Sequence, residues 1–175
     1  MLALMFRSNP LQALPDGLKR PMTATGRSPS WFADRYLLAL EVLGPNVAAD
    51  KLADVALSIV AQWAHETGRG QHEYAFNLGG WRAQSKEPFY EAKDNLSADG
   101  RAYRWRAWDD LPNAVAHQIQ RLHDRFPSAW RLLIAQPTAS SWVEELGRKG
   151  YYTAPPKSYA QAWAMHRHEL ARVGK

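Results

Sequence analysis

The chain has 175 residues, of which 46% are apolar, 22% charged and 11% aromatic, a composition typical of a globular domain and not of a disordered chain. Surface scaling indicates that a chain of this size buries about 70% of its surface without cross-links. It contains no cysteine, which excludes disulfide scaffolds, thiol proteases and thiolate zinc sites. A net charge of +5 favours a polyanionic partner such as nucleic acid, anionic lipid or cell-wall polymer.

Residues 1–30 are predicted to form an irregular N-terminal arm, because prolines and glycines interrupt them repeatedly. The apolar stretch from Met1 to Phe6 is too short for a signal-peptide core or a membrane span. We therefore expect synthesis in the cytoplasm without a signal peptide, no membrane insertion, and one folded domain over residues 31–175.

Two helices are predicted after the arm. Apolar residues at helical spacing begin at Trp31 and continue until Gly44-Pro45 ends the pattern. A second helix is predicted over about 50–67, where apolar side chains form a continuous stripe along one face.

A small β-hairpin is predicted next, with β-like runs at 89–92 and 102–108 on either side of a turn-rich segment. Helical patterning then resumes over 111–126 and again after Pro127, with Asp109 and Asp110 as candidate N-caps.

Two capping boxes predict the last helices. Ser141 with Glu144 indicates the start of a short helix that Gly147 closes, and Ser158 with Gln161 indicates the start of the final helix. The predicted fold class is therefore mainly α, in the α+β sense, with one inserted hairpin.

Glu66 is the first candidate functional residue. It falls on the apolar stripe of the second helix, near its C-terminal end, whereas His65 points well away from that stripe. Burial and the partial negative charge of a helix C-terminus both disfavour a carboxylate, so we expect a raised pKa for Glu66, as a general acid needs. The pattern alone leaves open that Glu66 turns to solvent or pairs with Arg69.

Two segments carry a family resemblance. Residues 61–70 read Ala-Gln-Trp-Ala-His-Glu-Thr-Gly-Arg-Gly, and residues 77–82 read Asn-Leu-Gly-Gly-Trp-Arg. They resemble the signature of family 73 glycoside hydrolases, which are bacterial N-acetylglucosaminidases with a lysozyme-like fold. That signature is a helix ending in Glu-Ser-Gly-aromatic-Gly, followed by Asn-Leu-Phe-Gly-Ile-Lys. Arg69 stands in place of the usual aromatic residue, and Gly79 in place of the usual Phe.

The resemblance continues downstream. Residues 103–115 are similar to the aromatic strand that leads into a helix in that family. Residues 150–153, Gly-Tyr-Tyr-Thr, together with Tyr159-Ala160, are similar to its Gly-Tyr-Ala-Thr-Asp-Pro-x-Tyr-Ala motif.

The resemblance implies a pair of catalytic carboxylates. It makes Glu66 the catalytic acid and places the second carboxylate on the hairpin, where it would assist water or stabilise the developing charge. Our choice is Glu91, which lies inside the first predicted strand, and the rival candidates are Glu87, Asp94 and Asp99.

Three further residues are predicted to bind substrate. Tyr151 and Trp81 are expected to line a glycan cleft, because aromatic faces stack on the C–H faces of sugar rings. Asn77 of the matched motif is the third.

No metal and no cofactor are expected. His65-Glu66 lacks a second histidine at metalloprotease spacing, since His72 lies beyond a glycine-rich break. Gly68 and Gly70 lack the Lys-Ser or Lys-Thr continuation of a phosphate-binding loop.

The predicted function is a peptidoglycan hydrolase, an endo-β-N-acetylglucosaminidase that cuts the β-1,4 bond between N-acetylglucosamine and N-acetylmuramic acid. We expect an antibacterial effector or toxin of a type VI secretion system, or a phage lysis enzyme, that acts in the periplasm or cell wall. Its partners would be glycan strands and a cognate immunity protein, with no nucleic acid. Two different functions stay open beside this one: a lytic transglycosylase or muramidase of related fold, and a non-catalytic basic protein that binds nucleic acid or belongs to a virion or secretion machine.

Overall fold

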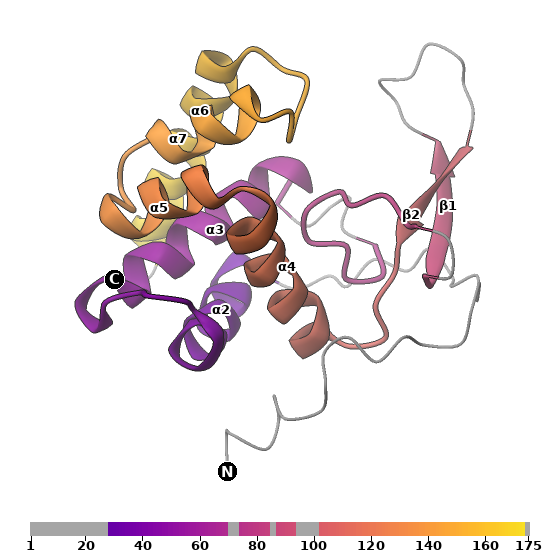
Figure 1. The fold of residues 1–175 in the computed structure, drawn as a ribbon, viewed down its shortest axis with the longest axis horizontal. Coiled ribbons are helices and arrows are strands. Elements are labelled where there is room, and N and C mark those ends of the chain that lie inside the picture. The colour runs from indigo at the N-terminus through magenta and orange to yellow at the C-terminus, as the bar shows by residue number, and fades with distance from the viewer. Residues whose placement is uncertain (1–27, 70–73, 85–86, 94–101, 174–175) are drawn as a thin grey trace.

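A computed structural model describes residues 28–69, 74–84, 87–93 and 102–173. In chain order its elements are α2 (Pro29–Leu43), the short 3-10 helix η1 (Ala49–Lys51), α3 (Leu52–Glu66), β1 (Phe89–Lys93), β2 (Ala102–Arg106), α4 (Leu111–Arg125), α5 (Pro127–Ala135), α6 (Ser141–Arg148) and α7 (Pro156–Val173). The helices lie together, and the β1–β2 hairpin stands apart from them (Figure 1). The predicted mainly helical fold with an inserted hairpin is confirmed.

The first helix begins two residues earlier than predicted. Pro29 occupies the first turn of α2, and the Ser28 hydroxyl accepts a hydrogen bond from the Trp31 N–H at 3.3 Å. Proline suits this position because its missing N–H has no helical partner there. Residues 1–27 of the predicted arm lie outside the described residues, so the arm itself stays a prediction.

Helix α3 is the centre of the fold and packs against both α2 and α7. Its predicted apolar stripe is buried, and the Trp63 ring lies 4.2 Å, centroid to centroid, from that of Phe32 on α2. Both side chains are fully buried. Truncating a buried aromatic residue of this kind costs about 3–5 kcal/mol, so this contact secures the helix that carries Glu66.

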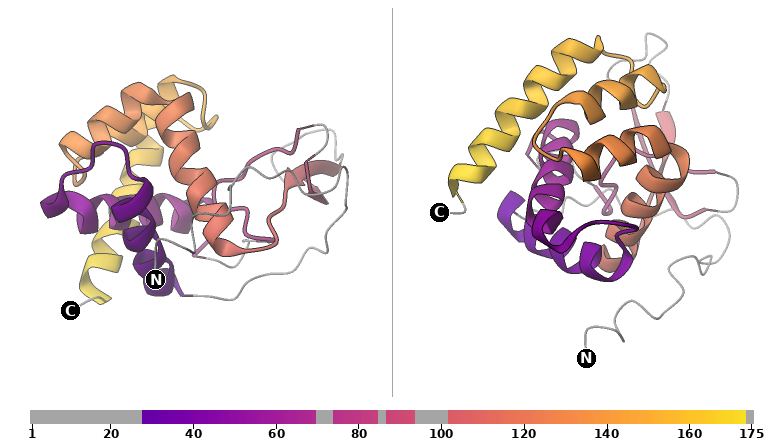
Figure 2. Two further views of the ribbon diagram at one scale, coloured as in Figure 1. Left: turned by 60° about the horizontal axis from the view of Figure 1, so that its bottom comes forward. Right: turned by 60° about the vertical axis from the view of Figure 1, so that its left-hand side comes forward.

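Helix α7 is attached to α3 through Ser58. The Trp163 indole N–H donates to the Ser58 carbonyl at 2.9 Å, and Arg167 Nε donates to the Ser58 hydroxyl at 3.0 Å. Two views of the ribbon show the long α7 against the bundle (Figure 2). Because Tyr159 lies one turn before Trp163, and Glu66 two turns after Ser58, this attachment brings Tyr159 and Glu66 to the same end of the α3–α7 pair.

One predicted cap is confirmed and two capping boxes are wrong. Asp110 caps α4, since its carboxylate accepts from the Asn113 N–H at 2.8 Å. Ser141 is the first residue within α6, and its hydroxyl is buried without a hydrogen-bond partner among the described residues. Ser158 lies inside the first turn of α7, because that helix already begins at Pro156.

Gly147 does not close α6, which runs on to Arg148. A Cβ at Gly147 would lie 2.5 Å from the Tyr152 hydroxyl, so glycine is needed there for packing.

The hairpin is antiparallel, as predicted, with Phe89 opposite Arg106 and Glu91 opposite Arg104. Side chains alternate between the two faces of a strand, so these four residues share one face and Tyr103 and Trp105 share the other. The guanidinium of Arg82 covers that second face, with its carbon 3.8 Å and 3.9 Å from the two ring centres. None of the described helices is both long and apolar enough to span a membrane.

Candidate active site

Glu66 is the last residue of α3 and is held by the way that helix ends. The Thr67 hydroxyl donates to the Trp63 carbonyl at 2.7 Å, and Gly68 turns the chain with a φ of +58°. Part of the Glu66 side chain is exposed, but its carboxyl group is surrounded by protein. Burial raises the pKa of Glu66, as predicted, and outweighs the opposite effect of a hydrogen bond from Tyr159.

That hydrogen bond runs from the Tyr159 phenol to Oε1 of Glu66. Burial and the nearby Glu66 raise the pKa of Tyr159 far above its usual value, so the phenol keeps its proton and acts as a donor. The Tyr159 ring stacks on Tyr152 with 3.7 Å between centroids, and the Tyr152 hydroxyl donates to the Val143 carbonyl at 2.7 Å. The Tyr159 phenol is therefore held by Glu66 on α3 and by the ring of Tyr152, which is itself bound to Val143 on α6.

Tyr159 was not among the predicted site residues, although its motif was part of the family resemblance. A contact between residues 93 positions apart has no local signal in a single sequence.

His65 does not face away into open solvent. Its ring lies 4.5 Å from that of Tyr159, in an edge-on arrangement, and 5.7 Å from that of His166. Burial, followed by repulsion from His166, lowers the pKa of His65. His65 therefore packs beside the Glu66–Tyr159 pair as a mainly neutral side chain at neutral pH.

The loop over 74–84 passes close to the Glu66 carboxyl group at Gly80. A Cβ built on Gly80, whose φ is +61°, would lie 4.0 Å from Oε2 of Glu66. The Asn77 amide fixes this loop, since Nδ2 donates to the Trp81 carbonyl at 2.9 Å and Oδ1 accepts from the Trp81 N–H at 2.8 Å. Asn77 is buried and both ends of its amide are used by the loop, so its predicted contact with substrate stays a prediction.

Trp81, which is part of this loop, lies against Tyr151. Their rings meet edge to face at 5.1 Å, the Trp81 indole N–H donates to Gln118 Oε1 at 2.6 Å, and the Tyr151 hydroxyl donates to the Gly79 carbonyl at 3.0 Å. Trp81 is 8% exposed, so most of its ring is packed against protein and only a small part could contact a sugar. Whether either ring stacks on a sugar stays a prediction.

Gly79 makes this packing possible. A Cβ at this position would lie between 2.6 and 2.8 Å from Gln118 Oε1, Trp81 Nε1 and the Tyr151 hydroxyl. A larger residue at position 79, such as the Phe of the signature, would therefore collide with Trp81 in its present position.

The two described hairpin carboxylates have different surroundings. Glu91 is exposed, and its carboxylate lies 3.7 Å from Nε of Arg104 on the opposite strand. Glu87 forms an ion pair with Arg106 and accepts from the Gln84 N–H at 2.8 Å. Burial opposes ionisation of Glu87, but these hydrogen bonds outweigh it and lower the pKa of Glu87.

No hydrogen bond or ion pair joins Glu66 to Glu87 or Glu91 in the described part of the chain. Asp94 and Asp99, which are also candidates for the second carboxylate, lie outside the described residues. The choice of Glu91 as second carboxylate therefore stays a prediction.

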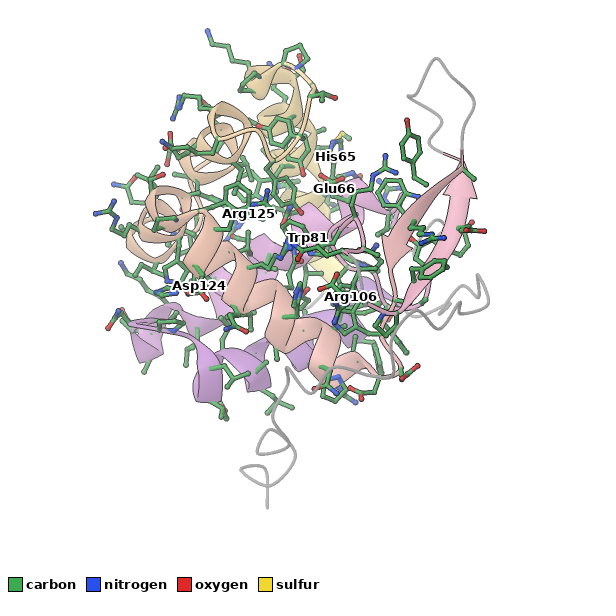
Figure 3. All side chains as sticks on the ribbon, turned by 45° about the vertical axis from the view of Figure 1, so that its right-hand side comes forward. His65, Glu66, Trp81, Arg106, Asp124 and Arg125 are labelled. Atoms are coloured by element: carbon green, nitrogen blue, oxygen red, sulfur yellow. The ribbon has the colours of Figure 1, made fainter. Side chains whose placement is uncertain are left out.

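Glu66, Trp81 and Arg106 follow one another on the side of the molecule between the helices and the hairpin (Figure 3). The Arg106 N–H donates to the Trp81 carbonyl at 2.8 Å, which joins the hairpin to the loop beside Glu66. Over residues 28–69, 74–84, 87–93 and 102–173, no three His, Asp or Glu side chains gather closely enough to hold a metal ion.

By sequence, the chain matches no family model and no curated protein. Its structure is similar to that of a peptidoglycan hydrolase from Sphingomonas sp. A1, with a TM-score of 0.59 and 23% identity over 80% of this chain and 87% of that one. The chain shares the fold of that protein. A C-terminally truncated glycoside hydrolase domain of Salmonella typhimurium FlgJ is also similar, with a TM-score of 0.51 and 21% identity over 82% of this chain and 95% of that one. The predicted α+β, lysozyme-like fold is confirmed.

Proposed function

We propose that this protein is a glycoside hydrolase that cuts the glycan strands of peptidoglycan, with Glu66 as the general acid. The observation that carries the proposal is the buried Glu66 carboxyl group at the end of α3, with a raised pKa and a fixed phenol donor. The fold, which is shared with a peptidoglycan hydrolase and a glycoside hydrolase domain, supports it.

The chemistry follows from the proton on Glu66. A carboxyl group with a raised pKa holds its proton near neutral pH and donates it to the glycosidic oxygen as the bond from that oxygen to the anomeric carbon breaks. The carboxylate left behind keeps the hydrogen bond from Tyr159, which stabilises the charged form. Glu66 is therefore protonated before the bond breaks, and its carboxylate accepts a hydrogen bond from Tyr159 afterwards.

A second carboxylate completes the reaction by activating water or by stabilising the positive charge on the sugar ring. We assign this role to Glu91, which is on the hairpin and exposed. Glu87, whose carboxylate binds Arg106 and the Gln84 N–H, stays the rival candidate among the described residues.

The finer proposal is an endo-β-N-acetylglucosaminidase that cuts after N-acetylglucosamine. We further propose that it acts in the periplasm or cell wall as an antibacterial effector or phage lysis enzyme, opposed by a cognate immunity protein when it is an effector. The net charge of +5 suits an anionic wall and supports this placement.

Digestion of purified sacculi tests the activity. The full chain is expected to release reducing ends, Glu66→Gln to release essentially none, and Glu41→Gln, on an exposed glutamate of α2, to behave as the parent. Equal activity in Glu66→Gln and the parent would reject the assignment of the acid.

Mass spectrometry of the products tests the specificity. Reducing N-acetylglucosamine ends support the glucosaminidase, whereas anhydromuramic ends would indicate a lytic transglycosylase, in which a single glutamate can suffice. For the place of action, we expect toxicity when the chain is directed to the periplasm and none when it stays in the cytoplasm.

A further inference from the structure

We infer that Arg121, whose guanidinium lies over the Trp81 ring, and Arg106, whose guanidinium lies over the Trp108 ring, form a subsite for a carboxylate carried by the glycan substrate. The inference rests on the proposed function, because the glycan must reach Glu66 for this subsite to lie along it. It adds a reason why the enzyme would prefer a carboxylate-bearing glycan to a neutral one.

The subsite lies close to Glu66 along the chain. A Cβ at Gly80 would lie 4.0 Å from Oε2 of Glu66, and Trp81 follows Gly80 in the chain. The Trp81 carbonyl accepts a hydrogen bond from the backbone N–H of Arg106 at 2.8 Å. The guanidinium carbon of Arg106 lies 5.2 Å from the centre of the Trp108 ring, and that of Arg121 on α4 lies 4.9 Å from the centre of the Trp81 ring. Figure 3 shows Trp81 and Arg106 on the side of the molecule where Glu66 lies.

Tyr151 links the same two places independently. Its ring meets the Trp81 ring edge to face at 5.1 Å, and its hydroxyl donates to the carbonyl of Gly79, the neighbour of Gly80, at 3.0 Å. Burial, and then the negative charge of Glu66, raises the pKa of the Tyr151 phenol, which agrees with this position.

Positive charge exceeds negative charge in this cluster. Glu87 pairs with Arg106, but Nε of Arg106 is buried and has no hydrogen-bond partner among the described residues. Arg121 is half-buried and forms no salt bridge within the described part of the chain, and its described contact is the Trp81 ring. Glu87 is thus paired with Arg106 alone, and the guanidinium of Arg121 keeps its donors for another acceptor.

The rest of α4 adds to the imbalance. Arg125 follows Arg121 by one turn, and burial, followed by repulsion from Arg125, lowers the pKa of Arg121. His117 lies one turn before Arg121, and burial, followed by repulsion from Arg121 and Arg106, lowers the pKa of His117 to about 4. His117 is therefore neutral at neutral pH, and the half-buried arginines supply the positive charge that an anion would compensate.

A carboxylate is the ligand chemistry that fits. Arginine presents planar pairs of N–H groups that match the two oxygens of a carboxylate. In peptidoglycan, carboxylates occur on the lactyl group of muramic acid where no peptide is attached, and on the stem peptide where one is. Oligomers of N-acetylglucosamine alone have none, which makes them the neutral comparison.

Binding measurements on the full chain carrying Glu66→Gln test the subsite, since this background cannot turn over the ligand. Three ligands are compared by calorimetry: N-acetylglucosamine oligomers, glycan strands stripped of their peptides, and strands that keep them. Adding Arg121→Gln is expected to weaken binding of carboxylate-bearing strands about tenfold, and binding of the neutral oligomers by less than about twofold. Weaker binding of stripped strands in Arg121→Gln would identify the lactyl carboxylate as the ligand. Weaker binding only of peptide-bearing strands would identify a carboxylate of the stem peptide.

Two matched variants accompany the test. Arg131→Gln removes an exposed arginine of α5 and is expected to bind all three ligands as the background does. Arg121→Lys keeps the charge but loses the planar pair of N–H groups, so it is expected to retain part of the preference for carboxylate-bearing strands, which a misfolded variant would not.

An equal loss on neutral and carboxylate-bearing ligands would overturn the inference and leave Arg121 as a support for the Trp81 ring. Unchanged binding in Arg121→Gln, with the background still binding glycan, would overturn it too and leave the proposed function standing. If none of the glycans binds the background, the proposed function fails and the subsite with it. Tighter binding of a DNA duplex, weakened by Arg121→Gln, would assign the cluster to nucleic acid.

Discussion

Tyr159 on α7 donates a hydrogen bond from its phenol to Oε1 of Glu66 on α3, across 93 positions of sequence. The contact has two opposed consequences. Burying the carboxyl group against α7 raises its pKa, and the phenol partly offsets that rise by stabilising the ionised form. The pair therefore sets the pH range over which Glu66 carries a proton.

Tyr159→Phe removes the offsetting hydrogen bond, so the pKa of Glu66 should rise further. The alkaline limb of the kcat profile on soluble glycan is expected to move to higher pH by about one unit, since a hydrogen bond to a charged group is worth roughly 1.5 kcal/mol or more. Tyr74→Phe is the control, because it also removes one phenol hydroxyl and keeps a ring whose described neighbour is Tyr90, 6.1 Å away between centroids. An alkaline limb in the parent's position would contradict this role of Tyr159.

Glu66→Gln should make the folded protein more stable at neutral and alkaline pH. A carboxyl group whose pKa is higher in the folded than in the unfolded state loses stability as pH rises from the unfolded value to the folded one. The variant cannot ionise, so its free energy of unfolding should match the parent's below pH 4 and exceed it above the folded pKa. Urea titrations at several pH values measure this, and a gap that does not change with pH would count against a raised pKa.

Neutralising Glu91 is predicted to lower activity, and neutralising Glu87 is predicted to lower stability. Glu91→Gln should lower kcat by about 10²–10⁴-fold while the fold keeps its stability, because the second carboxylate acts on the reacting groups. Glu87→Gln should lower the free energy of unfolding by about 1–3 kcal/mol, because it leaves a mostly buried Arg106 without its partner. A stable Glu87→Gln protein without activity, beside an active Glu91→Gln, would transfer the second role to Glu87.

Gly79→Ala tests the packing beside the site. The added Cβ would lie within 2.8 Å of Gln118 Oε1, Trp81 Nε1 and the Tyr151 hydroxyl, so at least one of these groups must move. We expect the free energy of unfolding to fall by about 1–3 kcal/mol and kcat/KM to fall as well, with a change in the near-UV circular dichroism spectrum. Parent-like stability and spectrum would show that the three groups are less constrained than their contacts indicate.

Most of the helices could be predicted because their signal is local. The spacing of apolar residues over 31–43, 50–67 and 111–126 reports a buried face wherever it occurs, and the same spacing identified Glu66 as a residue on such a face. The capping boxes failed because neighbours compete for the same role. Pro156 starts α7 before Ser158, and Ser141 falls inside α6.

The contacts around Glu66 could not be predicted in the same way. The hydrogen bond from Tyr159, the pair of Glu87 with Arg106 and the packing of Arg121 on Trp81 each join segments far apart in the chain. They depend on how α7 attaches to α3 and on the register of the hairpin, which periodicity does not encode. The two hydrogen bonds between the Asn77 amide and Trp81 were not predicted either, and the contact of Asn77 with substrate stays a prediction.

The account depends on Glu66 holding a proton at neutral pH, and a direct titration tests that. Carbon-13 NMR of the Glu side-chain carboxyl groups, with Glu66 assigned by its loss in Glu66→Gln, follows its ionisation in the full chain. We predict a midpoint clearly above the ordinary value of 4.5, because burial raises the pKa of Glu66. A midpoint at or below 4.5 would mean that Glu66 has no proton to give at neutral pH, and would contradict its role as the acid.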